Sequence, residues 1–232
     1  LLLLENRPLF HVLPFLIHVN HPDLPGYVES PSNDVLVPFG INNYSFRKDI
    51  EMALTRCFPS LQSLFTDIKS IWPRQRCIDS LVLMGSIGTI AQTDTSDFDY
   101  WVCVNGKQFS PQSLDLLTQK LRAIEQWADK KWGTEVHFFL SDIEKVKQND
   151  FGVADGESAG SAQALFLKAE FYSTNIVVAG KVPFWWLTPE KSTIKQYDGI
   201  LGNLEKGGSP DLDWFMDLGH LEKLDAGELF GA

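Results

Sequence analysis

The sequence has little positive charge. Lys and Arg number 20 against 30 Asp and Glu, so the formal net charge of the 232 residues is −10. This balance excludes the broad basic surface that duplex nucleic acid attracts, and we expect no nucleic-acid partner. An acidic excess also suits a protein that gathers divalent metal ions, although solubility is the simpler explanation.

Cysteine is scarce as well. Cys57, Cys77 and Cys103 are odd in number and lack metal-ligand spacing, which argues against a disulfide framework and a zinc knuckle. We expect buried thiols in a reducing compartment, which favours a cytoplasmic protein.

Long apolar runs are also missing. No stretch reaches the roughly 18–20 apolar residues that cross a bilayer, so no membrane insertion is expected. The apolar stretch 9–19 is interrupted by His11, Pro14 and His18, and it lacks a small-residue cleavage site. We interpret this stretch as a buried segment rather than a signal peptide.

The first third of the chain contains helical periodicity. Apolar residues over 46–57 recur at helical spacing, and a second run begins at Ser60 as its cap and stops at Pro73. Residues 20–40 are rich in Pro, Asn, Asp and Gly, which indicates a loop. We therefore predict a helical N-terminal flank over residues 1–76 of the same domain.

The middle of the chain is rich in strand signals. Runs of branched and aromatic residues predict strands at 80–84, 98–104 and 134–140, with a small, polar loop over 87–96. These strands lie within a catalytic core that we place at residues 77–190.

One helix separates the second strand from the third. Ser110 is a typical N-cap, Pro111 suits the first helical turn, and Gly133 stands where a helix ends. The order strand, loop, strand, helix, strand predicts an α+β (mixed α/β) fold with a mixed sheet flanked by helices.

The last part of the chain is expected to be mainly helical. The pattern predicts a helix over 165–176, an edge strand over 182–187 and a helix over 209–219. We assign residues 191–232 to a C-terminal helical segment leading into a missing remainder, because the chain lacks an initial Met and stops within a helical pattern.

Two carboxylates open the second predicted strand. Asp97 and Asp99 are two positions apart, so their side chains share one face of the strand. Like charges this close favour a bound cation, and Mg²⁺ prefers such oxygen ligands. Glu135 opens the third strand and would complete a three-carboxylate site if the two strands are neighbours.

A phosphate-binding turn is predicted directly after the first strand. Gly85 allows close approach of the backbone to a phosphate, and Ser86 offers a hydroxyl and an N–H group. Neither this turn nor an Asp-x-Asp pair is specific alone. Their combination, with an acid on a third strand, favours a functional site.

This combination resembles the signature of the nucleotidyltransferase superfamily, and more narrowly the N-terminal catalytic domain of bacterial class I adenylate cyclases. The similarity runs nearly end to end. It is carried by Met84-Gly85-Ser86, by Ser96 to Cys103, by His21 to Tyr27, by Gly133 to Leu140, by Glu170-Phe171-Tyr172, by Ala179-Gly180-Lys181, by Trp214 to Leu218 and by Glu228 to Ala232.

The resemblance implies a nucleotidyltransferase-like sheet and conversion of ATP to 3′,5′-cyclic AMP and pyrophosphate. Asp97, Asp99 and Glu135 would be catalytic and would hold two Mg²⁺ (or Mn²⁺) ions, while Gly85 and Ser86 would contact the triphosphate. A regulatory C-terminal region or a protein partner is also expected from the family.

Further residues are candidates for nucleotide binding. Ser96 belongs to the matched motif, and Lys181 offers a point charge for phosphate after a glycine turn, or is simply a solvated lysine. Ser161 either receives phosphate at a helix N-terminus or only caps that helix. His137 shares a strand face with Glu135, although a buried core histidine is the more ordinary interpretation.

Two alternative functions remain open. One is nucleotide transfer to a protein, RNA or small-molecule acceptor. The other is a nucleotide-binding module without turnover, which is favoured by departures from the family pattern. The family has further Ser and Gly where this chain has Thr89 and Ala91, an acid where it has Ala169, and arginines where it has uncharged residues such as Ser173.

Overall fold

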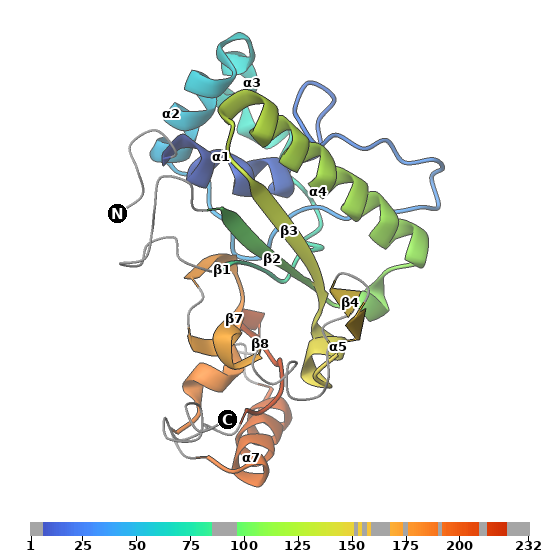
Figure 1. Cartoon of the computed structure of the whole chain (residues 1–232), viewed down its shortest axis with the longest axis vertical. Helices are drawn as coiled ribbons and strands as arrows, with labels where there is room; N and C mark the ends of the chain where they lie inside the picture. Colours follow the sequence, from blue (N-terminus) through green and yellow to red (C-terminus); the bar gives the residue numbers. More distant parts are fainter. Residues whose placement is uncertain are drawn as a thin grey trace. The chain divides into compact units, whose positions relative to one another are not determined.

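The structure is a computed structural model that describes residues 7–84, 97–150, 153–154, 157–158, 168–173, 176–189, 192–208 and 213–221 (Figure 1). The chain divides into two compact units. The first comprises Leu1–Leu140 with Ile176–Gly180, and the second comprises Ser141–Asn175 with Lys181–Ala232.

A four-stranded sheet forms the centre of the first unit. Its strands are β1 (Ser80–Met84), β2 (Phe98–Val104), β3 (Val136–Asp142) and β6 (Ile176–Gly180), in the order β3-β2-β1-β6. β1 is antiparallel to both β2 and β6, with Met84 opposite Asp99 and Ser80 opposite Gly180. Helices accompany this mixed sheet, so the α+β expectation is confirmed.

Three of these strands coincide with the predictions to different degrees. The strands at 80–84 and 98–104 are confirmed, and β3 begins at Val136 rather than at residue 134. The prediction that residue 176 ends a helix is wrong. Ile176 instead opens β6, because this segment pairs with β1. Residues 168–173 are helical, and the branched residues that follow pair with the free edge of β1.

Glycine is required where β6 ends. Gly180 has φ +110°, and a Cβ atom there would collide with the backbone of Asp79 and Ser80. Only a residue without a side chain allows the two strands to approach this closely. This constraint determines where Lys181 leaves the sheet.

Most helices of the first unit precede the sheet in sequence, namely α1 (Arg7–His18), α2 (Lys48–Cys57), η1 (Pro59–Leu61), α3 (Gln62–Thr66) and η2 (Ile68–Ser70). Between β2 and β3 lie η3 (Gly106–Gln108) and α4 (Pro111–Trp132). The apolar stretch 9–19 is buried as predicted, mostly within α1. No described helix is both long and apolar enough to cross a membrane.

The helix predicted from Ser60 to Pro73 is wrong. Ser60 caps nothing, because it lies inside the short 3₁₀ turn η1, whose N-cap is Phe58. Three short turns, η1, α3 and η2, replace one helix, and apolar residues from each turn pack against the core. The apolar residues over 61–71 therefore still face the core within each turn, but the helical hydrogen bonds do not run on continuously from one turn to the next.

Helix α4 begins and ends as predicted. The Ser110 hydroxyl accepts a hydrogen bond from the Ser113 N–H, and Pro111 occupies the first turn. Gly133 adopts the left-handed conformation with φ 61°, and its N–H bonds to the Asp129 carbonyl. Backbone groups at both ends of α4 are thus hydrogen-bonded, which stabilises the helix that connects β2 to β3.

One face of the sheet packs against α1 and α4, and α2 packs on α1 and joins the same core (Figure 1). Alternate residues of β2 supply this face, namely Phe98, Tyr100, Val102 and Val104. The three cysteines are free and buried, as expected, and burial, together with the nearby Asp79, raises the pKa of Cys103 to about 12. These thiols are therefore packing groups without nucleophilic character.

The second unit is built from short elements. They are α5 (Ile143–Lys147), β4 (Val153–Ala154), β5 (Glu157–Ser158), β7 (Val182–Pro183), η4 (Phe184–Leu187), α7 (Ile194–Lys206) and β8 (Phe215–Met216). β4 pairs with β5 antiparallel, and β7 pairs with β8 parallel. The expected helix over 209–219 is wrong, because its described part contains β8, and the expected edge strand over 182–187 is a strand only at β7.

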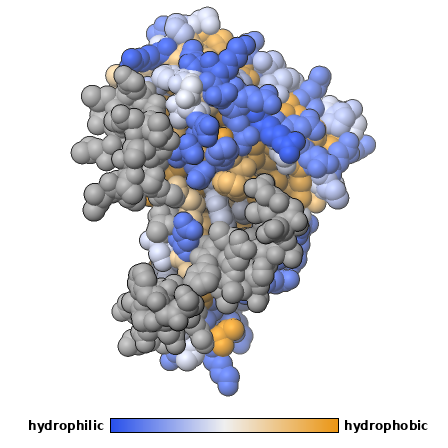
Figure 2. Space-filling model, viewed as in Figure 1, coloured by the Kyte–Doolittle hydropathy of each residue, from blue (hydrophilic) through white to orange (hydrophobic). Residues whose placement is uncertain are grey.

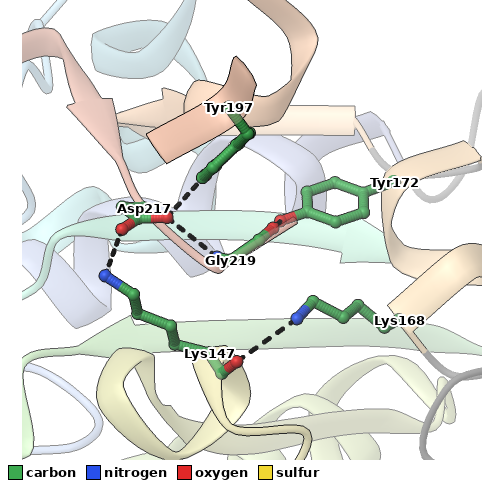
Figure 3. Close-up of polar contacts among 6 residues, drawn as sticks. All are labelled: Lys147, Lys168, Tyr172, Tyr197, Asp217 and Gly219. Atoms are coloured by element: carbon green, nitrogen blue, oxygen red, sulfur yellow. Dashed lines mark hydrogen bonds and ion pairs between the residues drawn. The ribbon is translucent and has the colours of Figure 1, made fainter. Parts of the chain in front are cut away.

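A polar network organises the second unit (Figure 3). The Asp217 carboxylate accepts hydrogen bonds from the Tyr197 hydroxyl at 2.5 Å, from the Gly219 N–H at 2.9 Å and from the Lys147 ammonium. Burial opposes ionisation of Asp217, but the bonds from Lys147 and Tyr197 outweigh it and hold its pKa below the ordinary value. The network ties α5 and α7 to the segment that follows β8.

Lys168 is a buried cation in this unit. Its ammonium donates to the Asn149 side-chain oxygen at 3.0 Å. It also donates to the Lys147 carbonyl at 3.5 Å, and the Tyr172 hydroxyl donates to the Gly219 carbonyl at 2.7 Å nearby (Figure 3). Burial lowers the pKa of Lys168 to about 8. Because its polar atoms are satisfied within the unit, we interpret Lys168 as a structural residue.

Candidate functional site

The starts of β2 and β3 lie side by side. The N–H group of Phe98 donates to the carbonyl of Glu135 at 3.0 Å. Phe98 opens β2 and Glu135 directly precedes β3, so both strands begin at the same end of the sheet, as parallel neighbours do. The condition set for Glu135 as a partner of the Asp pair, that the two strands be neighbours, is therefore met.

Three side chains converge at this end of the sheet, where β2 and β3 start. Asp97, Glu135 and His137 each place one ligand atom within 4.8 Å of the other two, and all three are exposed. The Nε2 atom of His137 lies 3.8 Å from a carboxylate oxygen of Glu135. Glu135, just before β3, and His137, within β3, thus lie close to Asp97, the residue that precedes β2.

His137 is the member of this group that sequence reasoning did not favour. Its side chain is 51% exposed, so the interpretation as a buried core histidine is wrong. The signal that could have identified it was present, since residues two apart on a strand share a face and Glu135 stands two positions earlier. Exposure is decided by what covers a strand, which spacing alone does not reveal.

Asp99 occupies a different environment from Asp97. It lies within β2, is half-buried and stands opposite Met84 of β1. Strand alternation places it on the face that lacks Phe98 and Tyr100, as expected, and Trp101 shares that face. Among the described residues, the converging group does not include Asp99, so its role as a ligand stays a prediction.

The three donor groups at this end of the sheet fit a divalent cation. Carboxylate oxygens of Asp97 and Glu135 are hard ligands of the kind that Mg²⁺ and Mn²⁺ take, and His137 adds an imidazole nitrogen. The three groups are open to solvent, so water and substrate phosphate oxygens can complete the coordination. Two carboxylates this close repel each other, and a bound cation would relieve that repulsion.

Several predicted nucleotide contacts lie outside the described residues. These are Gly85, Ser86, Ser96 and Ser161, together with the loop departures Thr89 and Ala91. Lys181 is described: it directly follows β6, is half-buried and belongs to the second unit. The nucleotide-binding role of all five predicted contacts stays a prediction.

The chain is similar to known proteins over most of its length. The profile of the family described as "Adenylate cyclase NT domain" matches residues 2–186. The chain is 33% identical over 232 residues to "Adenylate cyclase" of Haemophilus influenzae, and this match covers 95% of the chain and 26% of that protein. It is 32% identical over 228 residues to "Adenylate cyclase" of Escherichia coli, covering 97% of the chain and 25% of that protein.

The chain spans about a quarter of the length of the curated relatives it matches. No solved structure matches it. The matched family segment contains every residue of the converging group and the predicted phosphate-binding turn.

Proposed function

Because the chain belongs to the adenylate cyclase NT-domain family, we propose that it is a catalytic domain that converts ATP to 3′,5′-cyclic AMP and pyrophosphate. The observation that carries this proposal is the group of Asp97, Glu135 and His137 at the edge of a sheet inside the matched segment. Carboxylates so placed suit the handling of phosphate-bound cations.

The reaction is an internal displacement at the α-phosphorus. The ribose 3′-oxygen forms a bond to the α-phosphorus, the bond from that phosphorus to the β-bridging oxygen breaks, and pyrophosphate leaves. The proton of the 3′-hydroxyl passes to water, and no residue is assigned as a general base. In-line displacement of this kind depends on positioning and on neutralising charge.

We assign roles to the side chains accordingly. Asp97 and Glu135 hold cations at the start of β2 and β3, and Asp99 contributes from the same strand face as Asp97. When bound, two Mg²⁺ or Mn²⁺ ions would supply Lewis acidity and neutralise the charge of the triphosphate. Gly85, Ser86 and Ser96 would contact the phosphates, with Ser161 and Lys181 as further candidates.

Direct measurement of product tests this proposal. The chain is incubated with ATP and either Mg²⁺ or Mn²⁺, both alone and as a chimera in which it replaces the matching quarter of the Escherichia coli relative. We expect cyclic AMP from the chimera and a fall of roughly 100-fold or more in the Asp97→Asn/Asp99→Asn double variant, because the cation ligands lose their charge. Equal product from both proteins would refute the proposal.

The same assay separates the alternatives. A labelled acceptor without cyclic product would indicate nucleotide transfer instead of cyclisation. ATP binding without any metal-dependent product in the chimera would indicate a nucleotide-binding module.

A further inference from the structure

His137 stands among the proposed cation ligands without a role in the proposed function. It is one of the three residues whose ligand atoms lie within 4.8 Å of one another. The other two are acids, so the group combines two carboxylate oxygens with one imidazole nitrogen. A purely electrostatic site for phosphate-bound Mg²⁺ needs no such nitrogen.

The contact between His137 and Glu135 is a loose one, within reach of an ion pair but not hydrogen-bonded. The distance from Nε2 of His137 to the Glu135 carboxylate is 3.8 Å, which is beyond hydrogen-bonding range. One carboxylate oxygen of Asp97, the residue before β2, lies within 4.8 Å of the ligand atoms of both other residues. Three ligand atoms this close together, with no hydrogen bond between His137 and Glu135, can bind one ion in common.

The histidine also contributes little to the fold. Its side chain is about half exposed, and β3 is the edge strand of the sheet. Its ring contacts that of Phe139, with the two centroids 6.4 Å apart, and a phenyl ring would make the same contact, so packing does not require an imidazole there.

Imidazole discriminates among divalent ions. Mg²⁺ takes oxygen ligands and gives up water reluctantly, whereas first-row transition ions accept nitrogen ligands readily. A nitrogen donor beside two carboxylates therefore raises the affinity for Mn²⁺ more than the affinity for Mg²⁺.

We propose that His137 is a ligand that makes the Asp97–Glu135 site selective for Mn²⁺ over Mg²⁺. The inference rests on the proposed function only in that the same carboxylates hold the ion. It assigns a metal-specificity residue to this chain in addition to the acids.

Metal binding without nucleotide tests the assignment. Mn²⁺ affinity is measured by the electron paramagnetic resonance signal of free Mn²⁺, and Mg²⁺ affinity by competition. The variant His137→Phe keeps a planar ring on the strand and removes both nitrogens. We expect Mn²⁺ binding to weaken roughly tenfold and Mg²⁺ binding to change less than about twofold.

Two further variants sharpen the result. His137→Asp replaces nitrogen by oxygen, so the preference should move toward Mg²⁺ while an ion is still bound. His11→Phe is the matched control, because His11 also lies 3.9 Å from a single carboxylate, that of Asp49, but outside the group. It should leave both affinities unchanged.

A spectroscopic readout shows whether the imidazole itself is bound. In protein labelled with ¹⁵N-histidine, pulsed electron paramagnetic resonance of bound Mn²⁺ should show a hyperfine coupling to an imidazole nitrogen, and His137→Phe should abolish that coupling while His11→Phe keeps it. An unchanged Mn²⁺/Mg²⁺ ratio in His137→Phe, or equal loss of both ions, would overturn the assignment.

The outcome is separable from that of the proposed function. A chain that binds Mn²⁺ through His137 and makes no cyclic AMP in the chimera refutes the cyclase proposal alone. A chimera that makes cyclic AMP while His137→Phe keeps the wild-type ratio refutes the ligand assignment alone.

Discussion

At the residue scale, the candidate site consists of side chains that the fold does not need. Asp97, Glu135 and His137 are all exposed at the ends of strands. Their neighbours Phe98 and Val136 are buried in the core and fix the backbone from which the polar residues project. Buried and exposed positions alternate, so packing and chemistry are divided between the two faces of each strand.

Removing the charge of Glu135 should separate chemistry from stability. In Glu135→Gln we expect cyclic AMP formation by the chimera to fall roughly 100-fold, because a neutral amide binds a cation poorly. The melting temperature should stay the same or rise, since the side chain is 69% exposed and repulsion from Asp97 is relieved.

The control for this variant is Glu29→Gln, an exposed acid in the loop after α1. Its activity should equal that of the parent. A large loss of stability in Glu135→Gln would show that the carboxylate serves the fold.

At the element scale, helix α4 connects the two strands that carry the site and is itself anchored to the N-terminal flank. The buried ammonium of Lys120 donates to the carbonyls of Val19 at 2.6 Å and Gly26 at 3.0 Å, and to the Asn20 side chain at 3.5 Å. These three acceptors match the three protons of an ammonium group. Lys120 therefore holds the loop after α1 against α4.

This lysine should make stability depend on pH. Burial lowers its pKa from 10.5 to about 7, so above about pH 7 the unfolded chain holds a proton that the folded chain has released. Stability from this group therefore rises with pH, by at most about 1.4 kcal/mol per pH unit.

We expect Lys120→Met to flatten this rise and to destabilise the fold throughout, because the carbonyls of Val19 and Gly26 lose their donor. Urea unfolding between about pH 7 and pH 9 measures the slope. Lys131→Met, at an exposed position of α4, is the control. An unchanged slope in Lys120→Met would show that Lys120 does not titrate in this range.

The edge strand β3 is protected by the same helix. The carboxylate of Glu125 on α4 accepts a hydrogen bond from the N–H of Phe138 at 2.7 Å. Apolar side chains gather over β3 beside α4 (Figure 2), and Phe139 is 49% exposed. An unpaired backbone N–H on an edge strand, beside exposed apolar residues, favours pairing with a strand of another chain. The Glu125 carboxylate prevents this at Phe138 because it already accepts the hydrogen bond of that N–H.

In Glu125→Ala the free N–H of Phe138 should increase self-association of the chain. Light scattering as a function of concentration measures this change. Gln126→Ala, an exposed neighbour on α4, should behave as the parent does. Equal scattering from both variants would show that β3 is protected by other means.

At the scale of the whole molecule, the net charge of −10 and the local acidic site act in the same direction. A negative chain attracts divalent cations, and only the site described above brings donor atoms together among the described residues. Cation binding should therefore stabilise the folded chain as a whole.

Mn²⁺ at about 100 times its dissociation constant should raise the free energy of unfolding by about 2.7 kcal/mol. Addition of EDTA should remove this gain, and Asp97→Asn/Glu135→Gln should not show it. Thermal unfolding with and without each reagent measures the effect. Equal stabilisation of the double variant would place the ion elsewhere.

Local patterns predicted the elements that depend on neighbours in sequence. Ser110, Pro111 and Gly133 marked both ends of α4, and alternating apolar residues marked β1 and β2. Such signals succeed because capping bonds and strand faces are decided within a few residues. The same logic placed Asp97 and Asp99 on one face.

Elements that depend on distant partners were predicted poorly. Residue 176 entered a strand because β1 offered a free edge, and β8 formed where a helix was expected because β7 lies beside it. The capping box of Thr193 and Gln196 begins α7, a signal that local reasoning could have used. Long-range pairing can override local preference because it satisfies many backbone groups at once.

The sequence by itself determined the chemical types at the site and the family to which the chain belongs. Strand patterns and the family resemblance identify Asp97 and Glu135. Only the tertiary structure brought His137 into the group and left Asp99 half-buried in β2. The physical reason is that a strand pattern tells which residues share a face, whereas the packing of neighbouring strands and helices decides which of them meet.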